Sequence, residues 1–302
     1  MSDNATLFEQ QRPRLLSLAY RMLGEVQAAE DIVQESWLRW AGAPANSILS
    51  PTAWLTQVVT RLAIDQLRCA QQRREVYIGP WLPEPIIDEE AGCPSHLTTL
   101  AQECELALLW SLERLAVEER AAFVLSQVFE TPYADIARTL DKSEPACRQL
   151  VSRARQRVRD ASPRFDTTAE QLERALLSFA AAAASGDKEE VLRLLAPDVL
   201  GLTDGGGVVS AARIPLEGAE RVAQVFTHIA RKRAAAAGAL ELLSVNGQPA
   251  LAQLAGDEDD MIFTLRLDQY GKICWLYTLR NPRKLASVRA QHRRQRRGDS
   301  AL

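Results

Sequence analysis

The amino-acid sequence predicts a multidomain protein, with two all-α domains followed by an α+β domain. Apolar residues recur at helical spacing in the segments 5–24, 28–40 and 54–74. A helix-turn-helix pattern rich in arginine follows within residues 118–159. Beyond about residue 166, helical segments precede a run of short segments that we expect to form antiparallel strands, an order typical of α+β domains. We therefore expect domains at 1–78, 99–163 and 166–288, a linker at 79–98 and a basic tail at 289–302.

The charge is segregated along a chain that is nearly neutral as a whole. The 302 residues carry a formal net charge of −3, so affinity for nucleic acid has to come from local basic surfaces. Residues 61–74 contain four arginines and one acid, whereas residues 84–119 contain nine acids and one base. The acidic segment either shields its basic neighbours or is a solvated linker.

The sequence predicts a cytoplasmic protein without a metal or cofactor. Its five cysteines are scattered and form no C-x-x-C pair, which favours reduced thiols. Cys93, His96 and Cys104 are the only cluster that resembles a set of metal ligands, and they lack a fourth ligand nearby. No signal-peptide pattern and no apolar run of membrane-spanning length occurs, so no membrane association is expected.

The predicted helix 28–40 has two faces. Trp37, Trp40 and either Ile32 or Val33 form the apolar stripe that packs inward. A second stripe suits docking to another protein, although a solvated face has the same pattern. Its residues are Asp31, Gln34, Glu35 and Leu38.

A loop at 43–51 separates this helix from the predicted helix 54–74. Val58, Leu62 and their apolar neighbours face inward in that helix. Arg61, Asp65 and Arg68 lie together on another face. A basic face beside a short loop suits the binding of unstacked single-stranded nucleic acid.

The segment 131–159 predicts a helix-turn-helix. Tyr133–Leu140 is the first helix, with Thr131 as N-cap and Pro132 in its first turn. Asp141 and Lys142 form the turn, and Ser143 caps an arginine-rich second helix. Its apolar stripe packs inward and leaves Arg148, Gln149, Ser152 and Arg153 outward. This arrangement favours binding in the major groove of DNA, although a solvated basic helix has a similar composition.

Between the two helical domains, Pro80–Pro85 contains three prolines in six residues. Prolines at this density forbid a helix and favour an extended segment. Trp81 has a large apolar surface that a plain linker does not need, so the segment is predicted to dock.

The third domain has a predicted order of helices and strands. Helices are expected at 168–185, 188–195 and 218–233, and strands at 199–202, 240–245, 249–254, 261–267 and 273–279, with turns at Asn246-Gly247 and Tyr270-Gly271.

No catalytic residue is expected in this domain. His228 has the character of a surface residue, and Asp204 has no partner with which it could form an acid–base pair. Residues 257–260 are interpreted as a solvated turn. Residues 280–297 include eight basic residues and no acid. This segment is expected either to contact DNA or polymerase or to be solvated. Little order is expected after Val288.

These motifs resemble the extracytoplasmic-function (ECF) group of sigma-70 factors. Residues 31–39, 53–55 and 65–68 are similar to region 2, and residues 143–148 with 152–155 are similar to region 4.2. The resemblance implies an initiation factor that binds core RNA polymerase through Asp31, Gln34, Glu35 and Leu38. It implies that Ile48, Ser50, Thr52, Arg61, Asp65 and Arg68 contact the melted −10 element, and that Arg148, Gln149, Ser152 and Arg153 contact the −35 duplex.

Three further motifs resemble those of the ECF branch that carries a fused SnoaL-like domain, which has a nuclear-transport-factor-like cone. They are Trp81-Leu82-Pro83-Glu84-Pro85, Asp204-Gly205-Gly206-Gly207, and Asn281-Pro282-Arg283-Lys284-Leu285. The lysine that follows the glycines in that branch is Val208 here. The resemblance implies that this domain contacts the linker through the other two motifs and regulates the factor in cis. Two alternatives are an enzyme with a DNA-binding appendage and a helix-turn-helix repressor.

Overall fold

The computed structural model describes residues 3–43, 48–74, 77–88, 100, 104–161, 167–233, 240–254, 256 and 260–299. The chain forms two compact units. The helical unit comprises Met1–Val76 and Glu103–Pro163, and the C-terminal unit comprises Tyr77–Gln102 and Arg164–Leu302. The Pro-rich segment therefore groups with the α+β part of the chain.

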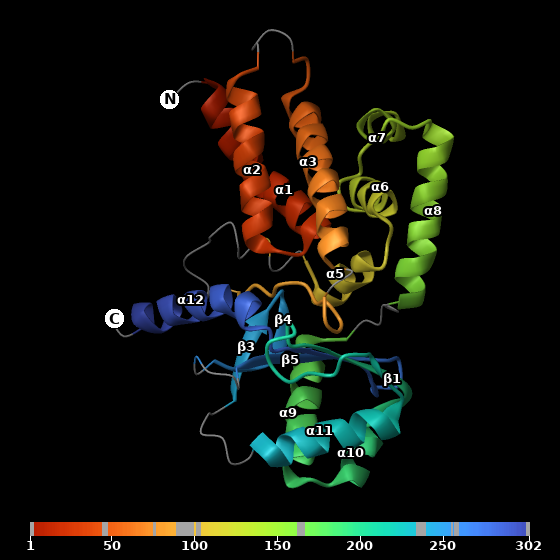
Figure 1. The fold of residues 1–302 in the computed structure, drawn as a ribbon, viewed down its shortest axis with the longest axis vertical. Coiled ribbons are helices and arrows are strands. Elements are labelled where there is room, and N and C mark those ends of the chain that lie inside the picture. The colour runs from red at the N-terminus through yellow and green to blue at the C-terminus, as the bar shows by residue number, and fades with distance from the viewer. Residues whose placement is uncertain are drawn as a thin grey trace. The chain divides into compact units, whose positions relative to one another are not determined.

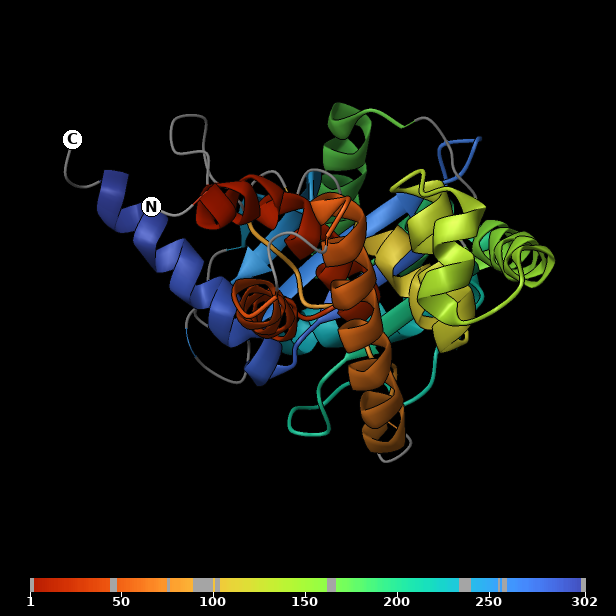
Figure 2. The ribbon, with the colours of Figure 1, turned by 90° about the horizontal axis from the view of Figure 1, so that it is seen from above.

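The helical unit begins with a three-helix bundle of α1 (Asp3–Leu23), α2 (Val26–Ala41) and α3 (Pro51–Arg74) (Figures 1 and 2). Gly24 ends α1 with a φ of 70°, a conformation that glycine adopts without a steric cost. Trp40 is buried as predicted and lies 5.7 Å from the ring of Trp54. The inward stripe of α2 includes both Ile32 and Val33.

Among the described residues, the helical unit also contains α5 (Leu106–Glu113), α6 (Val117–Gln127), α7 (Tyr133–Leu140) and α8 (Glu144–Ala161). The first helix of the predicted helix-turn-helix has the expected bounds, but its N-cap is Pro132 rather than Thr131, without a side-chain capping bond. Asp141 turns the chain in the left-handed conformation, and the Ser143 hydroxyl accepts a bond from the amide of Ala146 at 3.4 Å.

Buried arginines join α6 to the first bundle. The Arg120 guanidinium donates to the carbonyl of Arg21 at 3.0 Å, and both residues are buried. The guanidinium groups of Arg14 and Arg21 lie 5.0 and 5.8 Å from the ring centre of Phe129, within the range of cation–π attraction. Both predicted all-α domains are thus parts of one packed unit.

The C-terminal unit is a six-stranded sheet in the order β2-β1-β6-β5-β4-β3, with helices on one face (Figure 1). Its elements are α9 (Ala169–Ser185), α10 (Lys188–Leu194), β1 (Leu195–Asp204), β2 (Leu216–Glu217), α11 (Ala219–Arg233), β3 (Glu241–Val245), β4 (Gln248–Gln253), β5 (Met261–Leu267), β6 (Ile273–Leu279) and α12 (Pro282–Asp299). Phe179 of α9, Phe226 of α11 and Phe263 of β5 pack together in the core between helices and sheet. The predicted α+β class is confirmed.

Three expectations for this unit were wrong in detail. The sheet is mixed rather than antiparallel, because β1 pairs in parallel with β6. The basic tail continues as helix α12 to Asp299 instead of losing order after Val288. Asp260, at the end of the presumed solvated turn, is buried and pairs with Arg289 at 2.7 Å; residues 257–259 of that turn lie outside the described residues.

Cys93 and His96 of the rejected metal cluster also lie outside the described residues. Over the ranges that the structure describes, no helix combines the length and apolarity needed to cross a membrane.

Candidate DNA-binding and linker-binding surfaces

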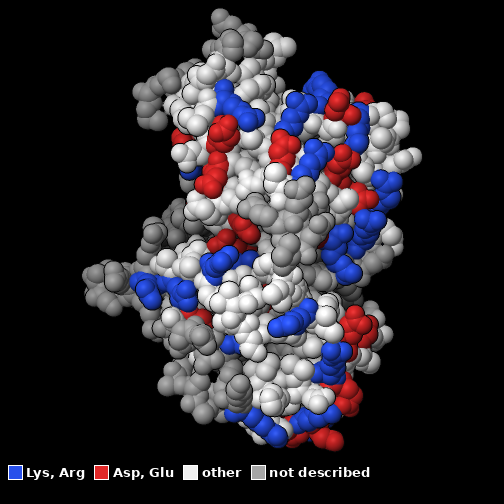
Figure 3. Space-filling model, viewed as in Figure 1, with Lys and Arg blue, Asp and Glu red and all other residues white. Residues whose placement is uncertain are grey.

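The second helix of the helix-turn-helix, α8, presents the predicted duplex-binding side chains to solvent. Cys147, Leu150, Val151 and Ala154 are buried at helical spacing, which leaves the opposite face outward. All four predicted −35 residues, Arg148, Gln149, Ser152 and Arg153, are exposed on that face. Figure 3 shows Lys and Arg side chains along α8, interspersed with acidic ones.

Two arginines of α8 are anchored by a buried carboxylate. Glu119 of α6 accepts hydrogen bonds from Arg153 at 3.1 Å and from Arg157 at 2.6 Å. Its side chain is 7% exposed, so the two charge-assisted bonds satisfy a carboxylate that water barely reaches. Arg148 is held differently, with its guanidinium 4.4 Å from the ring centre of Tyr133. These contacts fix the orientation of the exposed basic face.

The predicted −10 residues of α3 are exposed, and the arginines among them contact the helix-turn-helix domain. The Arg61 guanidinium donates to the carbonyls of Arg138 and Thr139, at the end of α7, at 2.9 and 3.1 Å. Arg68 reaches Glu118 of α6 at 3.5 Å while remaining 58% exposed. Asp65 lies 3.8 Å from Arg68. A polar cleft of about 650 Å³ lies among these side chains.

The loop before α3 completes the predicted single-strand surface. Ile48 and Thr52 are half-buried, whereas Ser50 is exposed, as is the neighbouring Leu49. Residues 44–47 of the same loop lie outside the described residues. An exposed apolar side chain beside a basic helix offers a surface against which an unstacked base can lie.

The predicted polymerase-binding stripe lies along one side of α2. Asp31, Gln34 and Leu38 are exposed and Glu35 is half-buried, paired with Arg39 at 3.2 Å. Leu38 is 60% exposed, which is unusual for a large apolar side chain on a packed helix. The stripe therefore combines two acids and an amide with an accessible apolar centre, a composition that suits a protein interface.

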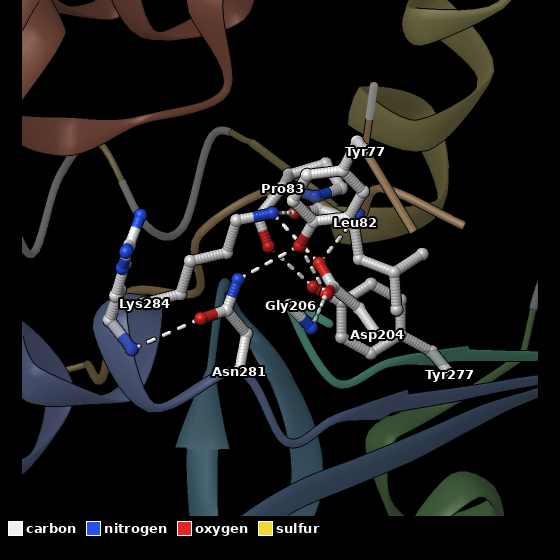
Figure 4. Close-up of polar contacts among 9 residues, drawn as sticks. Tyr77, Leu82, Pro83, Asp204, Gly206, Tyr277, Asn281 and Lys284 are labelled. Carbon is white, nitrogen blue, oxygen red and sulfur yellow. Dashed lines mark hydrogen bonds and ion pairs between the residues drawn. The ribbon is translucent and has the colours of Figure 1, made fainter. Parts of the chain in front are cut away.

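The Pro-rich linker lies on the sheet of the C-terminal unit and is held at Asp204, the last residue of β1 (Figure 4). The Asp204 side chain is 0% exposed. Its carboxylate accepts bonds from the Tyr77 hydroxyl at 2.5 Å, the Leu82 amide at 3.0 Å and the Gly206 amide at 2.9 Å. A buried carboxylate with this many donors is well satisfied, so Asp204 is a structural anchor for the linker.

Lys284 of α12 supplies the positive charge at this corner. Its ammonium lies 2.8 Å from the Asp204 carboxylate, donates to the Leu82 carbonyl at 2.5 Å, and sits 3.9 Å from the ring centre of Trp81. The side chain is 8% exposed. Val208, which replaces the lysine of the related branch, is 64% exposed. The charge that balances Asp204 therefore comes from the terminal motif rather than from the glycine loop.

Two of the three glycines lie where a side chain would not fit. A Cβ atom at Gly205 would lie 2.4 Å from the carbonyl oxygen of Val209. Gly206 has a φ of 66°, and a Cβ atom there would lie 2.6 Å from the Asn281 side chain. That asparagine in turn donates to the Tyr77 hydroxyl at 2.8 Å. The glycine loop and the Asn281–Lys284 segment thus enclose one end of the linker.

The rest of the linker is buried against the sheet and pairs with strand β3 at its edge. Leu82, Pro83, Glu84, Pro85 and Ile86 are all buried. The Tyr277 hydroxyl of β6 donates to the Pro83 carbonyl at 2.5 Å, and Ser287 of α12 contacts Glu84. Further along, the Ile86 amide donates to the Asn246 side chain at 2.9 Å, and Ile87 forms a β-bridge with Val245.

Several residues of these surfaces were not predicted from the sequence. Tyr77 and Tyr277 have no motif of their own, Asn246 was predicted only as part of a turn, and Glu119 was counted only as part of an acidic segment. The alternation of β6 indicates that Trp275 and Tyr277 share a face, but which partner covers that face depends on the tertiary fold. His228, considered as a catalytic base, is exposed on α11.

The comparisons with known proteins agree with the motifs. Residues 7–74 match the Sigma-70 region 2 family, and residues 106–158 match the Sigma-70, region 4 family. The chain is 37% identical over 303 residues to the ECF RNA polymerase sigma factor SigJ of Mycobacterium tuberculosis, covering 95% of both chains. It is 34% identical to a probable ECF RNA polymerase sigma factor, SigI, of the same species, covering 93% of this chain and 94% of that one.

The match extends to the fold. The crystal structure of the M. tuberculosis extracytoplasmic function sigma factor SigJ gives a TM-score of 0.76 at 34% identity, covering 93% of this chain and 98% of that one. The similarity thus includes the linker and the C-terminal unit as well as the two sigma regions. These relatives are transcription initiation factors rather than enzymes or repressors. The chain belongs to the ECF RNA polymerase sigma factors.

Proposed function

We propose that this sigma factor directs promoter-specific initiation in the cytoplasm and is regulated in cis by its C-terminal unit. Family membership implies binding of core RNA polymerase and promoter DNA. We assign polymerase binding to Asp31, Gln34, Glu35 and Leu38, contact with the melted −10 element to the loop 48–52 and to Arg61, Asp65 and Arg68, and contact with the −35 duplex to Arg148, Gln149, Ser152 and Arg153. Most of these side chains are exposed, and only Glu35, Ile48 and Thr52 are half-buried, which supports these assignments.

The observation that carries the regulatory proposal is the buried anchor of the linker at Asp204 and Lys284. The linker follows α3 directly in the chain and precedes the helix-turn-helix domain. Holding residues 77–88 against the sheet shortens the length of free chain that joins the two DNA-binding domains. The C-terminal unit thereby limits how far those domains can separate on a promoter.

Contacts inside the helical unit support a closed resting state. Arg61 and Arg68, which would face melted DNA, contact α7 and α6 instead. Engaging both promoter elements requires these contacts to break. They are partly exposed and therefore weak, so a few kcal/mol from polymerase and DNA is enough to release these two arginines.

The proposal is tested by transcription in vitro with core RNA polymerase and full-length protein. Asp204→Asn removes the charge of the linker anchor. Asp260→Asn is the matched control, because Asp260 is also buried and paired with a basic residue of α12 but contacts no described linker residue. We expect Asp204→Asn alone to change promoter output by about tenfold. Equal output from both variants and the unmodified protein would refute regulation through the linker.

A further inference from the structure

We infer that the C-terminal unit binds a hydrophobic, ring-containing small molecule that carries one anionic group, in a cavity between its helices and its sheet. The cavity has a volume of about 330 Å³. That volume lies at the lower end of the range found for small-molecule sites. Residues of α9, α11, β1, β4, β5 and β6 and of the loop 210–212 line it, so it lies between the two layers of this unit.

One wall of the cavity is aromatic. The rings of Phe179, Phe226 and Phe263 lie within 5.5 to 5.8 Å of one another, centre to centre. Phe179 and Phe263 are nearly parallel, with an interplanar angle of 20°. Alanines of α9 and α11 leave the space in front of this wall open. Flat apolar rings fit such a surface better than flexible chains do, because aromatic groups stack with offset or tilted geometry.

The sheet side of the cavity also carries polar groups, from β6 and β4, and Thr278 of β6 lies beside Phe263 in the neighbouring strand. Thr278 is 6% exposed and lines the cavity, yet its hydroxyl has no hydrogen-bond partner among the described residues. A buried hydroxyl without a partner is costly, so a ligand oxygen at that point would relieve the cost. Gln253 is buried on the neighbouring part of the wall.

The charge of the cavity selects an anion. Arg280 is the one charged side chain among the described residues that line it, and no acid is among them. The Arg280 guanidinium donates to the Ser210 carbonyl at 2.5 Å, which holds it at the rim. A carboxylate or another anionic oxygen group near Thr278 and Arg280 would complete a pocket that is otherwise apolar.

The alternation of β6 connects this cavity to the linker. Thr278 and Arg280 line the cavity, whereas Tyr277 points to the linker and Asn281 follows at the corner of Figure 4. The Arg280 amide also donates to the Asp204 carbonyl at 2.7 Å. A ligand that moves Thr278 or Arg280 therefore moves the strand that holds the linker. This regulatory part of the inference rests on the proposed function, whereas the binding site does not.

The site is tested with 1-anilinonaphthalene-8-sulfonate, an apolar ring compound with one anionic group, and with the full-length protein. We expect saturable binding measured by fluorescence. Ala183→Leu, which narrows the cavity from α9, should weaken binding about tenfold, whereas Ala181→Leu on the exposed side of the same helix should leave it unchanged. Equal affinities for these two variants would overturn the site.

The polar wall is tested with variants that preserve volume. Thr278→Val should weaken binding of the sulfonate probe by about three- to tenfold, because the hydroxyl donor is lost. N-phenyl-1-naphthylamine, which lacks the sulfonate, should bind more weakly to the unmodified protein and be insensitive to Arg280→Met. If the neutral probe binds as tightly as the anionic one, the assignment of an anionic ligand is wrong.

The proposed coupling between the cavity and the linker is tested separately, by hydrogen exchange. Hydrogen exchange of residues 77–88 should change by about threefold or more when the sulfonate probe saturates the site. If exchange of residues 77–88 is unchanged when the probe saturates the cavity, the coupling to the linker is wrong, but the binding site itself is not contradicted. If instead Asp204→Asn does not alter transcription while the probe binds, the proposed function fails and the site again stands.

Discussion

The helical unit and the C-terminal unit hold their functional segments in different ways. In the helical unit, the side chains assigned to melted DNA contact the neighbouring domain through exposed groups, such as Arg68 and Glu118 at 3.5 Å. In the C-terminal unit, the linker is held by fully buried groups, such as Asp204 and Lys284 at 2.8 Å. Exposed ion pairs contribute little, whereas a broken buried pair leaves an uncompensated charge. The comparison indicates that the linker is held strongly, whereas Arg61 and Arg68 can leave their contacts at little cost.

The largest effect on linker docking is expected when the buried ion pair between Asp204 and Lys284 is broken. Lys284→Met leaves the Asp204 carboxylate buried without its cation, which should cost about 3 kcal/mol or more in linker docking. Amide exchange of the linker should then accelerate by about two orders of magnitude.

Arg289→Met provides the control for Lys284→Met. It breaks the other buried ion pair of α12, with Asp260, and so destabilises the same unit. If both variants accelerate linker exchange equally, the hold is a property of the whole unit rather than of the Asp204 corner.

A buried carboxylate, Glu119, also anchors the exposed basic face of α8 in the helical unit. Glu119→Gln weakens the bonds to Arg153 and Arg157 and should loosen α8, lowering affinity for −35 duplex in the polymerase complex by about tenfold. The neighbouring variant Glu118→Gln changes only exposed pairs with Arg68 and Lys142. Comparable losses in both variants, measured by fluorescence anisotropy with labelled promoter, would contradict the role of burial.

A smaller effect on stability is expected when Arg61, whose contacts with α7 lie at the surface, is replaced. Arg61→Ala should lower the free energy of unfolding by at most about 1 kcal/mol, because its bonds to the carbonyls of α7 lie at the surface. Promoter opening, followed by permanganate reactivity of unpaired thymines, should nevertheless fall about tenfold.

Arg12→Ala removes a similarly exposed arginine, paired with Glu9 on α1, and should leave opening intact. A normal open complex with Arg61→Ala would remove this residue from the single-strand surface.

The smallest effect is a dependence of linker docking on pH. Burial raises the pKa of Asp88, which bonds to Ser244 and to the Gly247 amide at the far end of the linker. The docked carboxyl therefore binds a proton more readily than the released one. Docking should strengthen as the pH falls from 7 through the raised pKa, and the gain should level off below the ordinary value near 4. Linker exchange, corrected for its intrinsic pH dependence, should lose this component in Asp88→Asn.

Local signals explain what was predictable from the sequence. The bounds of α7, β5 and β6 were predicted correctly, because a proline, a glycine turn or a break in alternation marks their ends. The family resemblance also indicated the linker and the two motifs that enclose it. All of these signals lie within a few consecutive residues.

What could not be predicted depends on partners far apart in the chain. The parallel pairing of β1 with β6 joins residues more than 70 positions apart, and no local pattern encodes it. The run 280–297 has no acid and was interpreted as ending in a solvated tail. The structure instead places Arg289 against Asp260, and His292 3.0 Å from Glu241. Tertiary contacts of this kind stabilise a helix whose many positive charges repel one another.

Native-state hydrogen exchange of the full-length protein tests the central claim most directly. The amides of Leu82, Ile86 and Ile87 donate to Asp204, Asn246 and Gln291, all within the C-terminal unit. We predict that they exchange as slowly as the amides of β6, even though a Pro-rich linker free in solution would exchange within seconds. Exchange of these three amides at the rate of an unprotected peptide would contradict the account.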